Sequence, residues 1–313
     1  MELGFIRMPD CASARADLSA SLGHLSLADD LGIRIAYLPG LSPKQLLALG
    51  GAKTRNIKIA LDATSFGRLS PRDMEHAVRQ ANEALQKRLY LGINICCDSS
   101  CAQQRAQAQE FETIFSQNAV LSDNAGRTTY PMKTPCPKVL GLPVQGTPQE
   151  TAFAAARGYL PMTPSYLNTA EVARHWPAMV AGATSALRRA NPRHWQLARS
   201  IIIHDDPATI RTYVFSPNSP IRKYYETLQQ RGLLKGCVDS HLADLVIAGS
   251  SQQVAERILA LKETVGDIGT LYFIEHPEHD ATIARNTMVR LVQDVMPHVN
   301  TNDIHTFKEL ETT

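Results

Sequence analysis

One stretch of the chain decides the fold. Residues 139–163 read VLGLPVQGTPQETAFAAARGYLPMT. Val139 to Val144 is an apolar run of strand length, and Leu160 to Thr163 is a second, shorter one. Between them, Pro148 to Arg157 has the composition and period of a helix, which ends at Gly158. A strand, a helix and a strand in this order predict one β–α–β unit with parallel strands.

The same alternation continues outward from this unit to both ends of the chain. Eight strands are predicted, at residues 3–8, 33–38, 57–63, 89–95, 139–144, 160–163, 196–203 and 268–274. Helices are predicted at residues 18–31, 43–49, 71–85, 102–115, 148–157, 169–187, 221–231, 252–264 and 282–296. This order predicts an α/β fold, one (β/α)8 TIM barrel with insertions, as a single domain over residues 1–313. A doubly wound sheet is the alternative, but no Gly-rich dinucleotide fingerprint follows the first strand.

The composition excludes several classes of protein. Of the 313 residues, 44% are hydrophobic and 20% are charged, which excludes disorder as the main state. The formal net charge of +2 is too balanced for an electrostatic nucleic-acid footprint. The longest apolar runs, such as Thr270–Ile274, have strand length and fall far short of the roughly 20 residues that a membrane span needs.

We expect a cytoplasmic protein. The segment Met1–Arg7 has no basic region followed by an apolar core, so no secretory signal is predicted. Six cysteines in 313 residues fit a reducing compartment better than a disulfide framework.

Candidate catalytic residues stand directly after the predicted strands, because the active site of a TIM barrel lies at the carboxyl ends of its strands. Asp62 follows the third strand and Cys96 the fourth. His204 follows the seventh strand and His276 the eighth. Each of these side chains can give or take a proton, so all four are candidates for acid–base work.

These candidates also have simpler interpretations. The run His204-Asp205-Asp206 is equally suited to capping the helix that follows it. The cysteines Cys96, Cys97 and Cys101 do not have the spacing of a zinc site, and small apolar side chains at a buried strand end explain them. Residues 275–280 carry ligand-type side chains but form a turn at a proline. No metal site is predicted.

The run Gln145-Gly146-Thr147-Pro148 marks a helix start after the fifth strand. A hydroxyl and free backbone amides at a helix N-terminus form a site for an anion such as a phosphate. The alternative is a plain N-cap with proline in the first turn.

Three stretches taken together resemble the bacterial luciferase-like flavin monooxygenases. Residues 247–257 resemble a helix start of that family, with Ser251 where the family has proline, and residues 144–162 match its fifth strand, phosphate-side helix and sixth strand. Residues 195–199 and 221–225 resemble a limonene-hydroxylase-like subgroup.

The resemblance implies a barrel that binds reduced FMN non-covalently and uses it to activate oxygen. The flavin comes from a separate reductase, and the substrate is a small organic or biosynthetic molecule. Dimers of such barrels are expected, with an identical or a related chain. The implied cofactor-binding residues are Ala63, Asn94, Gln145, Gly146, Thr147, Ser165 and Tyr166. Asp62 and Ala63 fall where the family has a cis peptide beneath the flavin ring.

The site departs from the family pattern in two places. Residues 37–42 contain no histidine, where the family has its catalytic one, and Ile95 replaces an arginine that holds the flavin phosphate. Any acid–base group must then come from His204, Asp62, Cys96 or His276. Two alternatives remain: a catalytically silent partner subunit of a heterodimer, or a family barrel repurposed to a deazaflavin or to no cofactor.

Overall fold

The protein is described here from a computed structural model. The residues that it describes are 1–8, 18–41, 45, 54–66, 71–97, 106, 109–110, 113–114, 121–122, 128–129, 137–276 and 280–301. The chain divides into two compact units. Unit 1 comprises Met1–Asp10, Thr163–Pro177 and Asn191–Thr313, and unit 2 comprises Cys11–Met162 and Ala178–Ala190.

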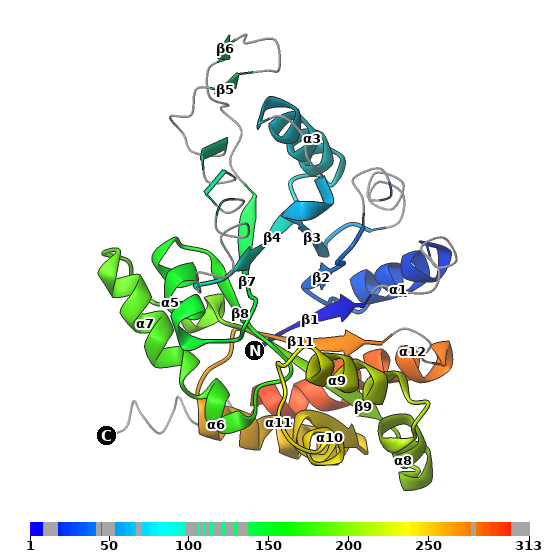
Figure 1. Ribbon diagram of the computed structural model, residues 1–313. Helices are drawn as coiled ribbons and strands as arrows, with labels where there is room; N and C mark the ends of the chain where they lie inside the picture. Colours follow the sequence, from blue (N-terminus) through cyan, green and yellow to red (C-terminus); the bar gives the residue numbers. More distant parts are fainter. Residues whose placement is uncertain are drawn as a thin grey trace. The chain divides into compact units, whose positions relative to one another are not determined.

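Unit 2 is built on parallel strands in the order β2-β3-β4-β7-β8 (Figure 1). The strands are β2 (Ile35–Tyr37), β3 (Lys58–Asp62), β4 (Leu89–Ile95), β7 (Lys138–Pro143) and β8 (Leu160–Thr163), the last of which ends at the first residue of a unit 1 segment. Its helices are α1 (Leu18–Asp30), the 3-10 turn η1 (Ala63–Phe66), α3 (Pro71–Ala84), α5 (Pro148–Ala156) and most of α7 (His175–Ser185). A short hairpin pairs β5 (Leu121–Ser122) with β6 (Thr128–Thr129).

Unit 1 contains parallel strands in the order β10-β9-β11-β1. They are β1 (Glu2–Arg7), β9 (Gln196–Ile203), β10 (Val246–Gly249) and β11 (Thr270–Glu275). The helices are α6 (Thr169–Val172), η3 (Pro192–His194), α8 (Pro207–Phe215), α9 (Pro220–Gln230), α10 (Val238–Leu245), α11 (Ser251–Val265), α12 (Ala281–Arg290) and a π-helical turn, η4 (Leu291–Val295).

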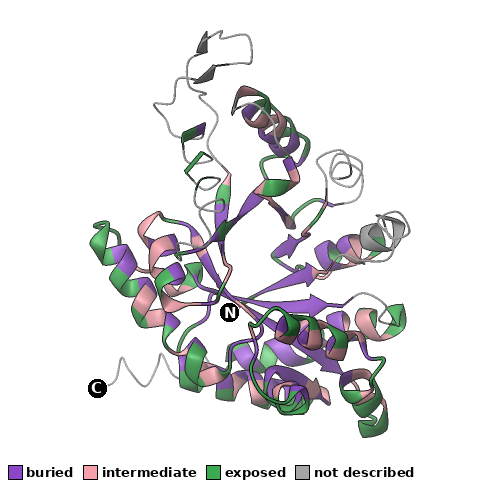
Figure 2. Ribbon diagram, viewed as in Figure 1, coloured by how far each residue is buried: buried purple, intermediate pink, exposed green. Residues whose placement is uncertain are grey.

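The strands form the core of each unit, as their colouring in Figure 2 shows. Every residue of β9 and of β11 is buried. In unit 1 the rings of Phe5 and Phe273 stack with their centroids 5.9 Å apart. Strands buried on both faces read as continuous apolar runs, which is why these segments are recognisable in the sequence.

All eight predicted strands occur. The structure differs from the prediction in the segments between these strands. β10 is an additional short strand that the sequence analysis did not predict. The single helix predicted over residues 169–187 is broken into α6 and α7, so that Pro177 falls in the first turn of α7. Proline is tolerated there because the first amides of a helix have no partner within it. The helix predicted at 43–49 and most of that at 102–115 lie outside the described residues.

None of the helices in the described ranges combines the length and the apolar character needed to cross a membrane.

Candidate functional site

A cluster of buried polar and aromatic side chains in unit 1 joins the end of β11 to the middle of β9 and to helix α9. His276 directly follows β11, and its Nε2 atom is 2.9 Å from the hydroxyl of Ser200 on β9. The hydroxyl of Tyr225 lies 3.4 Å from the same Ser200 oxygen. Ser165, just beyond β8, shares a 2.8 Å hydrogen bond with the hydroxyl of Tyr224. We call these five residues the His276 cluster.

Helix α9 covers this cluster with two adjacent tyrosines. The ring of Tyr224 meets the imidazole of His276 edge to face at 5.0 Å and the ring of Tyr225 at 5.2 Å. Burial raises the pKa of both phenols, so both remain protonated and act as neutral hydrogen-bond donors. The cluster therefore combines ring faces with hydroxyl and imidazole groups and contains no carboxylate.

A buried arginine holds the loop that follows β8. The guanidinium of Arg199 on β9 donates to the carbonyls of Leu167 at 2.9 Å, Ala198 at 3.0 Å, and Pro164 and Ser165 at 3.4 Å each. Among the described residues no carboxylate pairs with it. Burial lowers the pKa of Arg199 to about 10. Arg199 thus fixes Ser165 next to the cluster and leaves a positive charge close to it.

Tyr166, the other predicted residue in this loop, is also buried.

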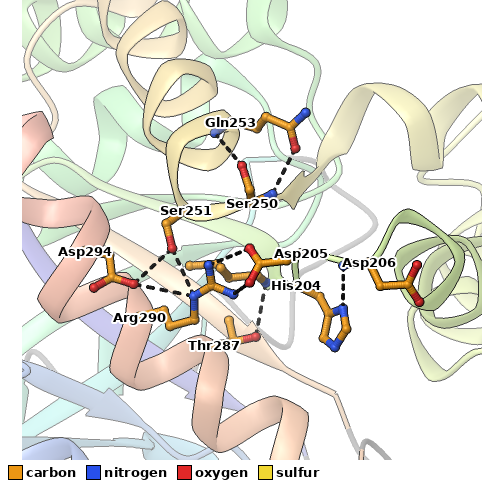
Figure 3. A network of polar contacts seen from close by, with 10 residues as sticks. His204, Asp205, Asp206, Ser250, Ser251, Gln253, Thr287, Arg290 and Asp294 are labelled. Atoms are coloured by element: carbon orange, nitrogen blue, oxygen red, sulfur yellow. Dashed lines mark hydrogen bonds and ion pairs between the residues drawn. The ribbon is translucent and has the colours of Figure 1, made fainter.

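His204 belongs to a separate polar network in unit 1 (Figure 3). Its Nδ1 accepts the backbone amide of Asp206 at 3.0 Å, and the Asp206 carboxylate caps α8. The neighbouring Asp205 forms a two-pronged ion pair with Arg290, whose Nε atom also donates to Ser251 at 3.0 Å. Within the described chain, no hydrogen bond joins His204 to the His276 cluster. The capping interpretation of this run is confirmed by the Asp206 contacts.

In unit 2, Asp62 stands at the carboxyl end of β3 and pairs with the last residue of β2. The hydroxyl of Tyr37 donates to one carboxylate oxygen of Asp62, and the amide of Gly40 donates to the other at 3.2 Å. Burial raises the pKa of Asp62, and these two hydrogen bonds offset only part of that rise. A carboxyl with a raised pKa beside a phenol is a candidate for proton transfer.

The other predicted residues of unit 2 differ in exposure. Asn94 is exposed near the end of β4, and Cys96 is buried just beyond that strand. Cys96 is disulfide-bonded, so its sulfur carries no proton for acid–base chemistry in this state. This disulfide differs from the expectation of reduced thiols. Ala63 begins η1, and the expected cis peptide before it is absent, because no peptide bond in the described segments is cis.

The predicted anion site at the start of α5 is already filled. The carboxylate of Glu150 accepts the backbone amides of Thr147 at 2.9 Å, Val144 at 3.2 Å and Gln145 at 3.2 Å. The hydroxyl of Thr147 accepts the amide of Glu150 at 3.3 Å. Gly146 has φ of +68°, a left-handed conformation that glycine adopts without a steric penalty and that brings these amides round one carboxylate. Three amides at this helix start therefore already have an acceptor within the chain.

Several residues of these sites were not predicted from the sequence. Arg199 and Tyr224 lie in the stretches 195–199 and 221–225 that carry the resemblance, but no role was predicted for them, and Ser200 lies in a predicted strand with no local signal. Glu150 had one: the pattern Thr-x-x-Glu over 147–150 is the signature of a capping box, in which the glutamate returns to the helix start.

No group of three or more His, Cys, Asp or Glu side chains in the described part of the chain could hold a metal ion.

No protein-family model matches the chain, and no curated protein sequence does. Solved structures do match. The oxygenating constituent of 3,6-diketocamphane monooxygenase from Pseudomonas putida, a type II Baeyer-Villiger monooxygenase in complex with FMN, superposes with a TM-score of 0.77. It is 18% identical, and the match covers 95% of this chain and 98% of that one.

Two further structures match over nearly their whole length. Monooxygenase RslO1 from Streptomyces bottropensis has a TM-score of 0.72 at 16% identity, with 95% of this chain and 99% of that one covered. The coenzyme F420 dependent tetrahydromethanopterin reductase from Methanopyrus kandleri has a TM-score of 0.65 at 14% identity, with 95% and 99% covered. The chain therefore has the (β/α)8 TIM-barrel fold, and its resemblance to the luciferase-like flavin monooxygenases is confirmed at the level of that fold.

Proposed function

We propose that this chain is a flavin-dependent oxidoreductase of the monooxygenase type that acts on a small organic substrate. The His276 cluster carries the proposal. It offers aromatic faces, hydroxyl groups and one imidazole at the carboxyl ends of β8 and β11 and the middle of β9. Such a lining suits a planar ring with polar edges, and the nearby positive charge of Arg199 favours an electron-rich one.

The reduced flavin would supply the two electrons of the reaction. One atom of molecular oxygen enters the substrate, and the other leaves as water. The chain orients the ring and excludes water from it: Ser165 and Tyr224 offer hydroxyl groups to the ring edge, while the buried imidazole of His276 shares a hydrogen bond with Ser200. Asp62, with its raised pKa and its Tyr37 partner, is a second group able to carry a proton.

The electrons would come from a separate reductase, which delivers reduced flavin to this chain. We also propose a cytoplasmic dimer, as expected for luciferase-like barrels.

A deazaflavin enzyme is the second candidate, because one of the matching structures is a coenzyme F420 dependent reductase. The same cluster of hydroxyl groups and rings would hold its planar ring. The chemistry would then be hydride transfer to or from the substrate with no need for oxygen.

The test is a titration of the purified protein with reduced flavin under anaerobic conditions, compared with F420. We expect saturable flavin binding that raises the melting temperature. His276→Gln should weaken it by about tenfold, the effect of about 1.4 kcal/mol of lost binding energy. His241→Gln is the matched control, because His241 lies on α10 and its ring forms an exposed hydrogen bond with the Lys235 carbonyl just before that helix. Tight binding of F420 alone would favour the second candidate. Binding of neither would oppose an enzyme role and favour a silent partner subunit.

A further inference from the structure

The geometry points to a flavin that is recognised by its ring system and gains nothing from a phosphate at the Thr147 loop, so that riboflavin and FMN bind alike. This inference rests on the proposed function. The observation behind it is that the Glu150 carboxylate already accepts the amides of Val144, Gln145 and Thr147, which a phosphate at this loop would need.

The fit of a phosphate to this loop can be judged from its donors. A phosphate at a helix start is held by backbone amides and a hydroxyl. Here the amides of Val144, Gln145 and Thr147 all donate to the Glu150 carboxylate. The Thr147 hydroxyl accepts from the Glu150 amide. Three backbone amides of the predicted site therefore already have an internal carboxylate as acceptor.

Glu150 does more than complete a capping box. In α6 the box glutamate, Glu171, is exposed and accepts one amide, that of Asn168. In α11 the same position is held by the neutral Gln253, which accepts the amide of Ser250. A capping box thus needs neither burial nor charge in this chain. Glu150, by contrast, is 1% exposed and binds two amides that precede the cap.

The negative charge of Glu150 also disfavours phosphate binding at this loop. A phosphate carries negative charge, and beside a buried carboxylate it would be repelled in a region of low dielectric. It would have to displace Glu150, whose carboxylate would then lose its three amide donors. A ligand without phosphate faces no such cost.

At three other helix starts, a side-chain carboxylate of this chain also accepts backbone amides. Asp206 accepts amides of α8, Asp280 accepts an amide of α12, and Glu171 serves α6. The His276 cluster, in contrast, presents hydroxyl groups and rings. The His276 cluster thus offers groups that suit a ring, whereas the Thr147 loop already holds a carboxylate where a phosphate would bind.

The experiment compares reduced riboflavin with reduced FMN on the full chain. We expect dissociation constants within about threefold of each other for the wild type. Glu150→Gln should improve FMN over riboflavin by about tenfold, because it removes the charge that repels the phosphate. Glu171→Gln, which changes an exposed box glutamate, should leave the ratio unchanged. A wild-type preference for FMN of about tenfold or more would overturn the inference.

Inorganic phosphate gives a readout that is independent of flavin. At matched ionic strength we expect phosphate to leave the melting temperature of the wild type unchanged and to raise that of Glu150→Ala, whose amides are released. Equal stabilisation of both proteins, lost in Thr147→Asp, would overturn the inference. If neither flavin binds the wild type, the proposed function fails, and the phosphate experiment still decides whether Glu150 blocks this loop.

Discussion

The amide of Thr147 donates to the carboxylate of Glu150 at 2.9 Å, and the amide of Glu150 donates back to the Thr147 hydroxyl at 3.3 Å. This reciprocal contact joins the end of β7 to the start of α5. The loop that resembles a phosphate site is thus held together by a carboxylate of the chain itself, that of Glu150.

The first prediction concerns the stability that Glu150 provides. Glu150→Ala should lower the free energy of unfolding by about 1–3 kcal/mol, because the amides of Gln145 and Thr147 lose their buried acceptor, while the Val144 amide keeps the Ile95 carbonyl at 2.9 Å. Urea denaturation measures the change. Glu171→Ala, which removes an exposed glutamate that accepts one amide, should cost less than about 1 kcal/mol. Equal costs for the two variants would show that the extra Glu150 contacts contribute nothing.

Asp62 should make the free energy of unfolding fall as pH rises above its unfolded pKa. Its pKa is raised by burial, so the stability that its protonated form contributes is present below the unfolded pKa of about 3.9 and is lost as pH rises through the folded value. Asp62→Asn should therefore gain stability relative to the wild type as pH rises above about 3.9, the unfolded pKa of an aspartate. Unfolding free energies across this range test the sign, with the exposed Asp267→Asn as control.

Tyr37→Phe tests the effect of the Tyr37 hydrogen bond on the pKa of Asp62. The Tyr37 hydrogen bond lowers the pKa of Asp62, against the larger effect of burial. Its removal should raise that pKa further, as followed by NMR titration of the carboxyl carbon. A fall would contradict the pairing of Tyr37 with Asp62.

Asp29 should show the opposite pH dependence. Burial raises its pKa, but hydrogen bonds from the amides of Arg55, Asn56 and Ile57 outweigh this, and the net pKa is lowered. Its stabilisation is therefore present above the unfolded pKa of about 3.9 and is lost as pH falls through the folded value. Asp29→Asn should cost about 1–3 kcal/mol at pH 7 and progressively less in acid. The exposed neighbour variant Asp30→Asn should show no such trend.

Arg199→Met should destabilise the protein by about 2–4 kcal/mol, because four backbone carbonyls lose their donor. Arg199→Lys keeps the charge but not the forked geometry, so it should recover only part of the loss. Chemical denaturation measures both, and the exposed Arg189→Met serves as control. If Arg199→Met were as stable as that control, Arg199 would not hold the loop after β8.

Glycine variants in two helices should have opposite effects. A Cβ atom at Gly182 of α7 would lie 2.0 Å from the carbonyl oxygen of Ala152 in α5, so Gly182→Ala should cost about 1–3 kcal/mol or more. At Gly23 of α1 nothing lies within 4 Å, and Gly23→Ala should stabilise the protein by up to about 1 kcal/mol. Thermal unfolding of the two variants gives the signs. A stabilising Gly182→Ala would contradict the close approach of α5 and α7.

The order of strands and helices was readable from the sequence alone. Strands buried on both faces carry continuous apolar runs, and helices carry a different period, so each element is encoded in its own residues. The positions of Asp62, Ser165, His204 and His276 at strand ends follow from that order. The split of residues 169–187 and the strand β10 were missed because short elements depend on neighbours distant in the chain.

The partners of these residues were decided only by the tertiary structure. Tyr224 meets Ser165 across 59 positions of sequence, and Ser200 meets His276 across 76. Such contacts leave no local pattern, because they arise when parallel strands bring their carboxyl ends together. The same holds for Arg199, whose guanidinium reaches the loop after β8. The sequence determined which groups stand at the strand ends, and folding determined which of them touch, because contact between distant residues depends on packing and not on local periodicity.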